Sequence, residues 1–224
     1  MGIGLVGDSA AAVVFARALA ESGHALVGRS VPPEERADSV DAVLPGVPVL
    51  DVEWVVRRSE LVIVAAEGQA LTSLVTQFAT ERWCQPGQIV CHLDYQRGLE
   101  VLGPLVEQGV IPLWLYPLVP LTGSSVDLPR LHDAWCAVAA PTPVLPIVQA
   151  LAIEVGMEPL VIEPHQMEPF RESVHKTLSL ASNIVTEATE PLIDAGVPDA
   201  SIALGTLLRH AVDQAIKAAG AGRG

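Results

Sequence analysis

The chain has 224 residues, of which 50% are hydrophobic, and its 26 acidic and 13 basic side chains give a formal net charge of -13. So much apolar surface collapses in water, which excludes disorder as the main state. The length allows one large domain or one domain with a smaller partner. The acidic excess excludes nucleic acid as a partner, because phosphate backbones are repelled and no cluster of lysines and arginines offsets the repulsion.

The apolar runs are too short to cross a bilayer. Glycine, proline and charged residues interrupt runs such as 61–66 and 89–93, whereas a membrane-spanning helix needs about 20 apolar residues. The N-terminal MGIGLVG lacks the basic flank of a secretory signal and is predicted to be the first strand. The three cysteines, Cys84, Cys91 and Cys136, form no CxxC motif. We therefore expect reduced, mostly buried thiols in a cytoplasmic protein.

Short apolar runs alternate with helical patterns from the N-terminus to about residue 162. The predicted strands are 2–6, 25–28, 47–50, 61–65, 88–93, 111–116, 134–139 and 159–162. The predicted helices are 10–22, 52–59, 70–82, 99–108 and 143–155. Strands that are apolar throughout belong in a parallel sheet covered on both faces. The alternation therefore predicts an α/β fold, a doubly wound and mostly parallel Rossmann sheet over residues 1–162.

The pattern becomes entirely helical after residue 162. Helices are predicted over 166–195 and 199–219, separated by Gly196, Val197 and Pro198, in the order expected beyond a helix C-terminus. Residues 163–224 are thus predicted to form a small all-α C-terminal unit. A unit of roughly 60 residues is marginal alone. We expect it to pack on the first domain, on a second subunit or on both, and to form a homodimer through its helices.

The first strand–turn–helix unit carries a dinucleotide-binding pattern with one change. In GxGxxG the first glycine makes the turn, the second lets a pyrophosphate approach the backbone and the third permits close helix packing. Here these positions are Gly7, Ser9 and Ala12. Ser9 places a Cβ and a hydroxyl where the phosphates come nearest. Either the helix N-terminus still binds a cofactor through residues Gly7, Asp8, Ser9 and Ala10, or the site has decayed and Ser9 only caps the helix.

The end of the second strand indicates which cofactor this turn would hold. The carboxylate that selects NAD is missing there, and Arg29 and Ser30 stand in its place. An arginine and a serine suit the 2′-phosphate of NADP, so NADP is favoured over NAD. The alternative is a surface arginine that Glu34 and Glu35 partly neutralise.

The order of motifs resembles the 6-phosphogluconate dehydrogenase-like superfamily, which includes pyrroline-5-carboxylate reductase and ketopantoate reductase. Within it, the chain is most similar to bacterial Rossmann-like proteins whose helical C-terminal domain has no assigned function. The residues that carry the resemblance are Gly7 with its helix, Gly23-His24, Gly28-Arg29-Ser30, the runs 61–66 and 88–92, and the helix with His175, Ser182 and Asn183.

The chain also departs from this family. Relatives carry Pro-Asp-Asp in a loop along the cofactor, where this chain has Ala66, Glu67 and Gly68. Ala66 and Glu67 are nevertheless the residues expected beside the cofactor. His92 ends a strand whose carboxyl edge should face the crevice, so it is a further cofactor-site candidate.

The resemblance implies that a helix of the C-terminal unit presents Lys or His and Asn to the substrate. Asn183 lies eight residues after His175 and shares its helix face, and Lys176 borders that face. His175 or Lys176 would supply a proton and Asn183 would hold an oxygen. The alternative is that this polar face is a helix–helix contact. The histidines show no metal-ligand spacing, so no metal is expected.

These observations favour an NAD(P)-dependent oxidoreductase that acts on a small carbonyl, imine or hydroxy acid, with NADP or NAD as cofactor. The alternative is a catalytically degenerate Rossmann-like binding or assembly protein without a cofactor. Ser9 and Glu67 favour the alternative, whereas Arg29 and the order of elements favour the enzyme.

Overall fold

The computed structural model describes residues 1–221. The chain divides into two compact units, the first from Met1 to Met167 and the second from Glu168 onward. The division falls at the start of the long helix α8 (Met167–Asp194). Each unit is described by itself.

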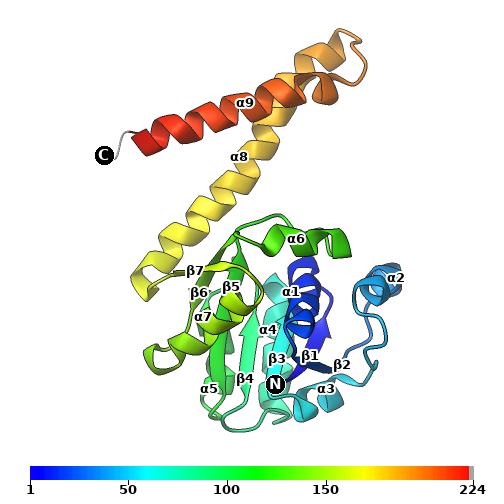
Figure 1. Cartoon of the computed structure of the whole chain (residues 1–224), viewed down its shortest axis with the longest axis vertical. Coiled ribbons are helices and arrows are strands. Elements are labelled where there is room, and N and C mark those ends of the chain that lie inside the picture. The colour runs from blue at the N-terminus through cyan, green and yellow to red at the C-terminus, as the bar shows by residue number, and fades with distance from the viewer. Residues whose placement is uncertain (222–224) are drawn as a thin grey trace. The chain divides into compact units, whose positions relative to one another are not determined.

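One seven-stranded sheet forms the centre of the first unit, in the order β2-β1-β3-β4-β5-β6-β7 (Figure 1). The strands are β1 (Gly2–Gly7), β2 (Ala25–Arg29), β3 (Leu61–Ala65), β4 (Ile89–His92), β5 (Ile111–Pro117), β6 (Trp135–Ala139) and β7 (Glu158–Val161). Every neighbouring pair is parallel except β5 and β6. The predicted doubly wound, mostly parallel α/β sheet is confirmed.

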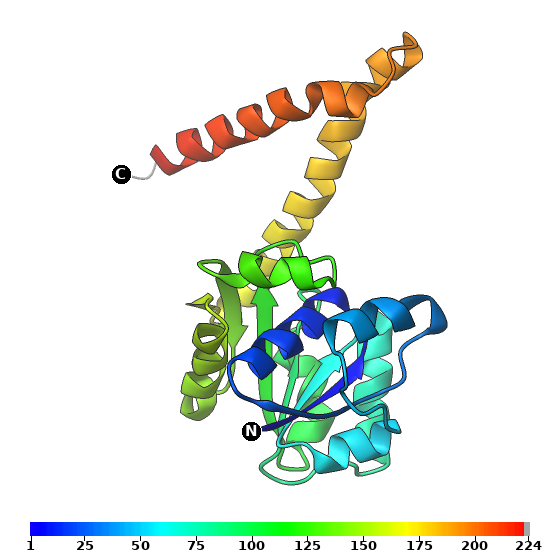
Figure 2. The same ribbon diagram turned by 45° about the vertical axis from the view of Figure 1, so that its right-hand side comes forward.

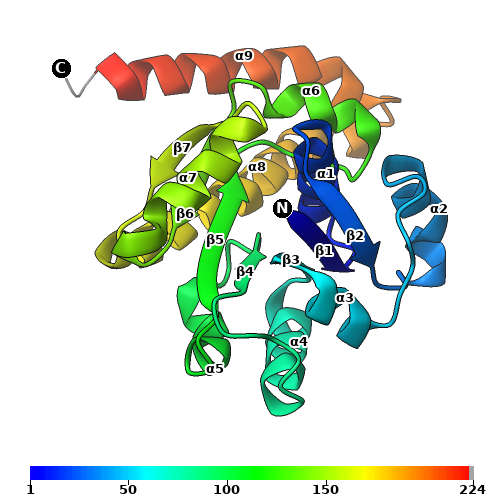
Figure 3. The same cartoon turned by 60° about the horizontal axis from the view of Figure 1, so that its bottom comes forward.

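Helices cover both faces of this sheet, with α1 and α7 on one side and α4 and α5 on the other (Figure 3). The helices of the unit are α1 (Ala10–Glu21), α2 (Glu34–Val43), α3 (Val52–Arg58), α4 (Gly68–Thr80), α5 (Gly103–Val106), α6 (Leu128–Leu131) and α7 (Leu145–Glu154). Short 3-10 turns are η1 (Leu99–Leu102), η2 (Ser125–Asp127), η3 (Thr142–Val144) and η4 (Pro164–Gln166). Strand β3 is buried along its whole length, as expected for a strand covered on both faces.

The structure differs from the prediction at residues 47–50 and at helices α2 and α6, neither of which was predicted. Residues 47–50 form no strand, and Val49 makes only an isolated bridge to Arg29. Two hydrogen bonds make this bridge, from Arg29 N–H to Pro48 O and from Leu50 N–H to Arg29 O, each at 2.9 Å, and Pro48 has no N–H of its own with which to extend the pairing. Helix α2 was not predicted, because it has few apolar positions and buries only Val40 and Val43.

The second unit consists of α8 and α9 (Ala200–Ala221), close to the two predicted helices. Gly196 adopts a φ of +75° just beyond α8, which a glycine does without strain. The two helices diverge from their connecting turn (Figures 1 and 2). Among the described residues of this unit, only Thr189 and Ala200 are buried. No helix within residues 1–221 is long and apolar enough to cross a membrane.

Candidate functional site

The carboxyl ends of β1 and β3 meet at a cleft of about 640 Å³. The strand order reverses at β1, since β2 lies on one side of it and β3 on the other. In doubly wound sheets such a switch point is where ligands bind. The cleft is lined by Gly7, Asp8, Ser9, Ala10, Arg36, Ala65, Ala66, Glu67, Ala70, Ser73 and Leu74. It thus brings together six predicted cofactor residues: Gly7, Asp8, Ser9, Ala10, Ala66 and Glu67.

The turn after β1 is built around the carbonyl of Ala65. Gly7 has a φ of +100°, and a Cβ on it would lie 2.8 Å from the Ala65 carbonyl carbon. The N–H groups of Asp8 and Ser9 each donate to the Ala65 oxygen at 2.9 Å. Only glycine combines this φ with this close approach, so Gly7 has the turn-forming role that the motif predicts.

Ser9 occupies the N-cap position of α1, but its side chain makes no capping hydrogen bond. The first bond of the helix runs from Val13 N–H to Ser9 O at 3.0 Å. The earlier N–H groups of the first turn therefore have no partner within the helix. The reading of Ser9 as a simple cap has no support in its contacts, and its side chain lines the cleft instead.

Arg36 of α2 is a cleft residue that the sequence reasoning missed. Its Nη2 donates to the backbone oxygen of Asp8 at 3.0 Å, and its Nε lies 3.2 Å from Asp8 Oδ2. No motif marks this residue, and α2 itself was not predicted. The sequence shows Glu34 and Glu35 next to Arg36, but their spacing does not indicate whether Arg29 or Arg36 reaches the cleft.

A second cavity of about 250 Å³ continues along the same edge, since Ala10 and Glu67 line both. Asp94, which lines this second cavity and is buried, accepts from Gly68 N–H at 2.7 Å and Gln96 N–H at 2.9 Å. Partial burial, and then the charge of Asp94, raise the pKa of Glu67 above its usual range. The loop 66–68 is therefore held in place by the hydrogen bond from Gly68 N–H to Asp94.

Two aromatic rings form part of the wall of this second cavity. The centroids of Tyr95 and Tyr116 lie 5.3 Å apart, with an angle of 49° between the rings. Burial raises the pKa of Tyr116, and the charges of Tyr95, Glu67 and Asp94 raise it further. The phenol is therefore held in its neutral form, able to donate a hydrogen bond.

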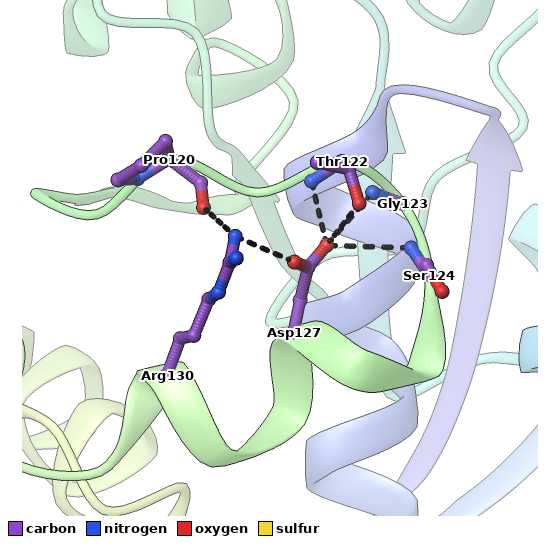
Figure 4. A network of polar contacts seen from close by, with 6 residues as sticks. All are labelled: Pro120, Thr122, Gly123, Ser124, Asp127 and Arg130. Carbon is purple, nitrogen blue, oxygen red and sulfur yellow. Dashed lines mark hydrogen bonds and ion pairs between the residues drawn. The ribbon is translucent and has the colours of Figure 1, made fainter. Parts of the chain in front are cut away.

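The loop that follows β5 forms a compact polar network next to the first turn of α1 (Figure 4). Asp127 is fully buried, and its Oδ2 accepts from the N–H groups of Thr122 (2.6 Å), Gly123 (3.0 Å) and Ser124 (3.3 Å) and from the Thr122 hydroxyl (3.0 Å). Arg130 Nη1 bonds the other oxygen at 3.1 Å. Burial opposes ionisation of Asp127, but these hydrogen bonds outweigh it and lower its pKa.

Arg29 and Ser30 lie at the end of β2, and neither lines the cleft. The Arg29 side chain is buried, and its Nη2 pairs with the exposed carboxylate of Asp41. Its Nε and Nη1 are buried without a hydrogen-bond partner. Ser30 Oγ accepts from Gly7 N–H at 2.9 Å, so Ser30 fixes the turn from behind.

His92 is completely buried and lines neither cavity. Its Nδ1 accepts from Asp94 N–H at 3.3 Å, and its Nε2 lies 3.1 Å from Gly98 O. These contacts require a neutral ring with the proton on Nε2. His92 therefore orients the loop that carries Asp94, and a direct contact with a cofactor stays a prediction.

His175, Lys176 and Asn183 lie on α8 of the second unit, and all three are exposed. Lys176 Nζ pairs with Glu172 Oε1 at 2.5 Å. None of the three lines either cavity, and their catalytic role stays a prediction. Within residues 1–221, no three His, Cys, Asp or Glu side chains gather in a way that could hold a metal ion.

Comparisons with known proteins identify the fold. A candidate NADP oxidoreductase from Bacteroides fragilis has a TM-score of 0.76 and 17% identity, over 95% of this chain and 79% of that one. Pyrroline-5-carboxylate reductase from Streptococcus pyogenes has a TM-score of 0.69 and 16% identity, over 97% and 79%. A Plasmodium falciparum pyrroline carboxylate reductase with NADP bound has 0.63 and 9%, over 97% and 78%.

No curated protein sequence matches the chain. The likeness to these structures confirms the predicted Rossmann-like plan with a helical C-terminal part. The sequence profile of the Rossmann-like domain matches residues 1–117, which is more than half of the 224 residues. The chain therefore belongs to the Rossmann-like domain family.

Proposed function

We propose that this protein is an NAD(P)-dependent oxidoreductase that acts on a small carbonyl, imine or hydroxy acid. The observation that carries the proposal is the cleft at the switch point, where Gly7 brings the backbone against Ala65 and opens the N-terminus of α1. Backbone N–H groups at such a helix end favour a pyrophosphate. The structural neighbours named as oxidoreductases support the same assignment.

In this proposal the two cavities, which share Ala10 and Glu67 as lining residues, would hold the two ends of a dinucleotide. The pyrophosphate would lie at Gly7–Ala10, and the nicotinamide would reach the cavity walled by Tyr95 and Tyr116. The nicotinamide supplies or accepts the hydride when bound. Tyr116, neutral because burial raises its pKa, would donate a hydrogen bond at that end.

NADP is the preferred cofactor in this proposal because of Arg29. Two of its nitrogens are buried without a partner, and a buried donor without an acceptor costs free energy. Asp41, which pairs with Arg29, is 60% exposed on its side chain, so an arriving 2′-phosphate can replace it. The P. falciparum neighbour has NADP bound, which supports the choice.

Substrate contacts are assigned to α8 in this proposal. His175 or Lys176 would donate the proton and Asn183 would hold the substrate oxygen. The test is turnover of a panel of small ketoacids and imines by His175→Ala, Lys176→Ala and Asn183→Ala. A loss of kcat with unchanged binding of NADPH supports the role, whereas unchanged rates assign this face to packing.

A homodimer through α8 and α9 completes the proposal. Large apolar side chains remain exposed on both helices, among them Leu180, Ile184, Ile202, Leu207 and Ile216 at 50–76%. A large exposed apolar patch on a soluble protein often marks an interface with another chain. We expect light scattering to give the mass of two chains, and Ile184→Glu with Ile216→Glu to reduce it to one chain. A wild-type monomer contradicts the dimer.

The function is tested by titrating NADPH and NADH into the purified protein with calorimetry and thermal shift. Ser9→Gly removes the Cβ at the point of nearest phosphate approach, so we expect it to tighten binding, and Ser9→Val to weaken it. No binding of either cofactor to wild type at millimolar concentration contradicts the enzyme and leaves the degenerate binding protein. Binding that is indifferent to both Ser9 variants contradicts the location.

A further inference from the structure

Arg36 is a cation that lines the cleft, and its position is set by three separate parts of the fold. It comes from α2, it bonds the backbone of the β1–α1 turn at Asp8 O, and it lies beside the loop after β5. The Arg36 side chain is 33% exposed, so it is reachable from the cleft. This residue belongs to no motif of the sequence, and the proposed function does not use it.

The pairing of Arg36 with Asp8 is incomplete. Nε lies 3.2 Å from Asp8 Oδ2, but it makes no hydrogen bond although it is buried. The bond that Arg36 donates to Asp8 is from Nη2 to the backbone oxygen, at 3.0 Å. An arginine has five N–H donors in a fixed fork. The guanidinium at the start of α1 therefore keeps donor capacity that an anion with several oxygens can use.

Gly123 lets the loop after β5 approach Arg36 and Ala10 closely. A Cβ there would lie 3.2 Å from Arg36 Nη2 and 3.2 Å from Ala10 Cβ, and Gly123 has a φ of +81°. Asp127 fixes this segment through three N–H groups of Thr122, Gly123 and Ser124 (Figure 4). Arg36 and Ala10 are thus both held against one rigid loop, beside the first turn of α1.

We propose that Arg36 recognises the pyrophosphate of the cofactor, and that the Asp8 carboxylate competes with that pyrophosphate for the same guanidinium. The inference rests on the proposed function, because it assigns a residue of the same cleft. A guanidinium forks onto phosphate oxygens in the geometry it uses for carboxylates. Arg36 would supply the charge that the turn itself lacks, since Asp8 and Glu67 line the cleft beside it.

Arg36 and Arg29 would contact different phosphate groups of the cofactor. Arg36 bonds the turn at Asp8 O, where a pyrophosphate lies in this class of sheet. Arg29 lies at the end of β2, where a 2′-phosphate lies. Loss of Arg36 therefore affects NADPH, NADH and inorganic pyrophosphate alike, whereas loss of Arg29 affects NADPH alone.

Calorimetric titrations of the full chain with NADPH, NADH and inorganic pyrophosphate test the inference. We expect Arg36→Gln to lower the affinity for each of the three ligands by about tenfold, which is the contribution of one charge-assisted contact. Asp8→Asn should tighten them by about threefold, because the competitor is removed. The control is Arg57→Gln on α3, which removes the same charge from an exposed pair with Glu53 outside the cleft; it should leave all three affinities unchanged.

The outcomes distinguish this inference from the function on which it rests. If Arg36→Gln binds all three ligands with the affinity of wild type, the role of Arg36 is overturned and the enzyme proposal still stands. Pyrophosphate binding that depends on Arg36 without binding of NADPH or NADH overturns the enzyme and keeps the phosphate site. Binding of none of the three overturns both. If Arg36→Gln does not fold, Asp8→Asn is the deciding variant. Weaker or unchanged binding by Asp8→Asn overturns the proposal that the Asp8 carboxylate competes with the pyrophosphate for Arg36.

Discussion

Gly7 and Ala65 lie so close that no side chain fits between them. A Cβ on Gly7 would lie 2.8 Å from the carbonyl carbon of Ala65, and the same carbonyl oxygen accepts from Asp8 and Ser9 N–H groups. These two residues end β1 and β3 in register. The contact therefore joins the two strands at the switch point and shapes the turn that faces the cleft.

Gly7→Ala is expected to destabilise the protein more than Gly23→Ala. Both glycines have a φ of +100°, but nothing lies within 4 Å of a Cβ on Gly23. Gly23→Ala should cost about 1–2 kcal/mol for the backbone conformation alone, and Gly7→Ala about 2 kcal/mol more for the clash. Urea denaturation measures both. Equal losses would show that the Ala65 contact relaxes freely.

Asp127→Asn is expected to lower the free energy of unfolding by about 2 kcal/mol at neutral pH, because an amide satisfies the N–H cluster less well than a carboxylate. The pKa of Asp127 is lowered from its usual 3.8. Its contribution is therefore fully present above the unfolded value and is lost as the pH falls through the lower folded value.

The difference in the free energy of unfolding between wild type and Asp127→Asn should therefore be constant near neutral pH. It should shrink in acid, once the pH falls below the pKa of Asp127 in the unfolded state. Denaturation from pH 3 to 7 measures it, with Asp51→Asn as the control, since Asp51 is exposed and makes no side-chain capping bond. A difference that grows in acid is incompatible with this role of Asp127.

Glu67 is expected to make cofactor affinity depend on pH. Its pKa is raised above 4.5 by burial and then by Asp94, so the side chain is neutral below that raised value and repels a pyrophosphate above it. Affinity for NAD should therefore fall as the pH rises through the raised pKa. Glu67→Gln should tighten binding at neutral pH by about two- to fivefold and remove this step. Glu53→Gln, at an exposed position of α3 outside the cleft, is the matched control. A pH step that is unchanged in Glu67→Gln refutes the assignment.

Arg29→Ala is expected to lower the affinity for NADPH by about tenfold, because one charge-assisted contact to the 2′-phosphate is lost. The affinity for NADH, which has no 2′-phosphate, should change little. The buried guanidinium must exchange Asp41 for that phosphate. Asp41→Asn should accordingly favour NADPH over NADH. Fluorescence titration gives both affinities, and equal weakening of the two cofactors by Arg29→Ala removes the argument for NADP.

Local patterns were sufficient to predict most of the first unit. The central strands β1, β3, β4 and β5 are short, mostly buried runs between turns. Gly7 is recognisable because a strand, a tight turn and a helix follow one another directly. The helices α8 and α9 were predictable because apolar positions recur at a helical period. These features are set by residues that are close together in the sequence, so local patterns are enough to predict them.

Other features of the site depend on contacts between distant segments. Arg36 reaches the cleft from a weakly amphipathic helix and stops against Gly123, 87 residues later in the chain. Arg29 is buried and pairs with Asp41 of α2, twelve residues later in the chain. His92 is turned inward by the backbone of Asp94 and Gly98. No spacing in the sequence specifies these pairings, so the roles of all three needed the fold.

The central claim is that a dinucleotide binds at the turn between β1 and α1, and amide NMR of the labelled protein titrated with NADPH tests it most directly. We predict saturable shifts of the amides of Gly7, Ser9, Ala10 and Glu67, which line the cleft, with smaller shifts for the distant turn at Gly23. Saturating NADPH that leaves these amides unmoved, or moves only residues outside the cleft, would contradict the account.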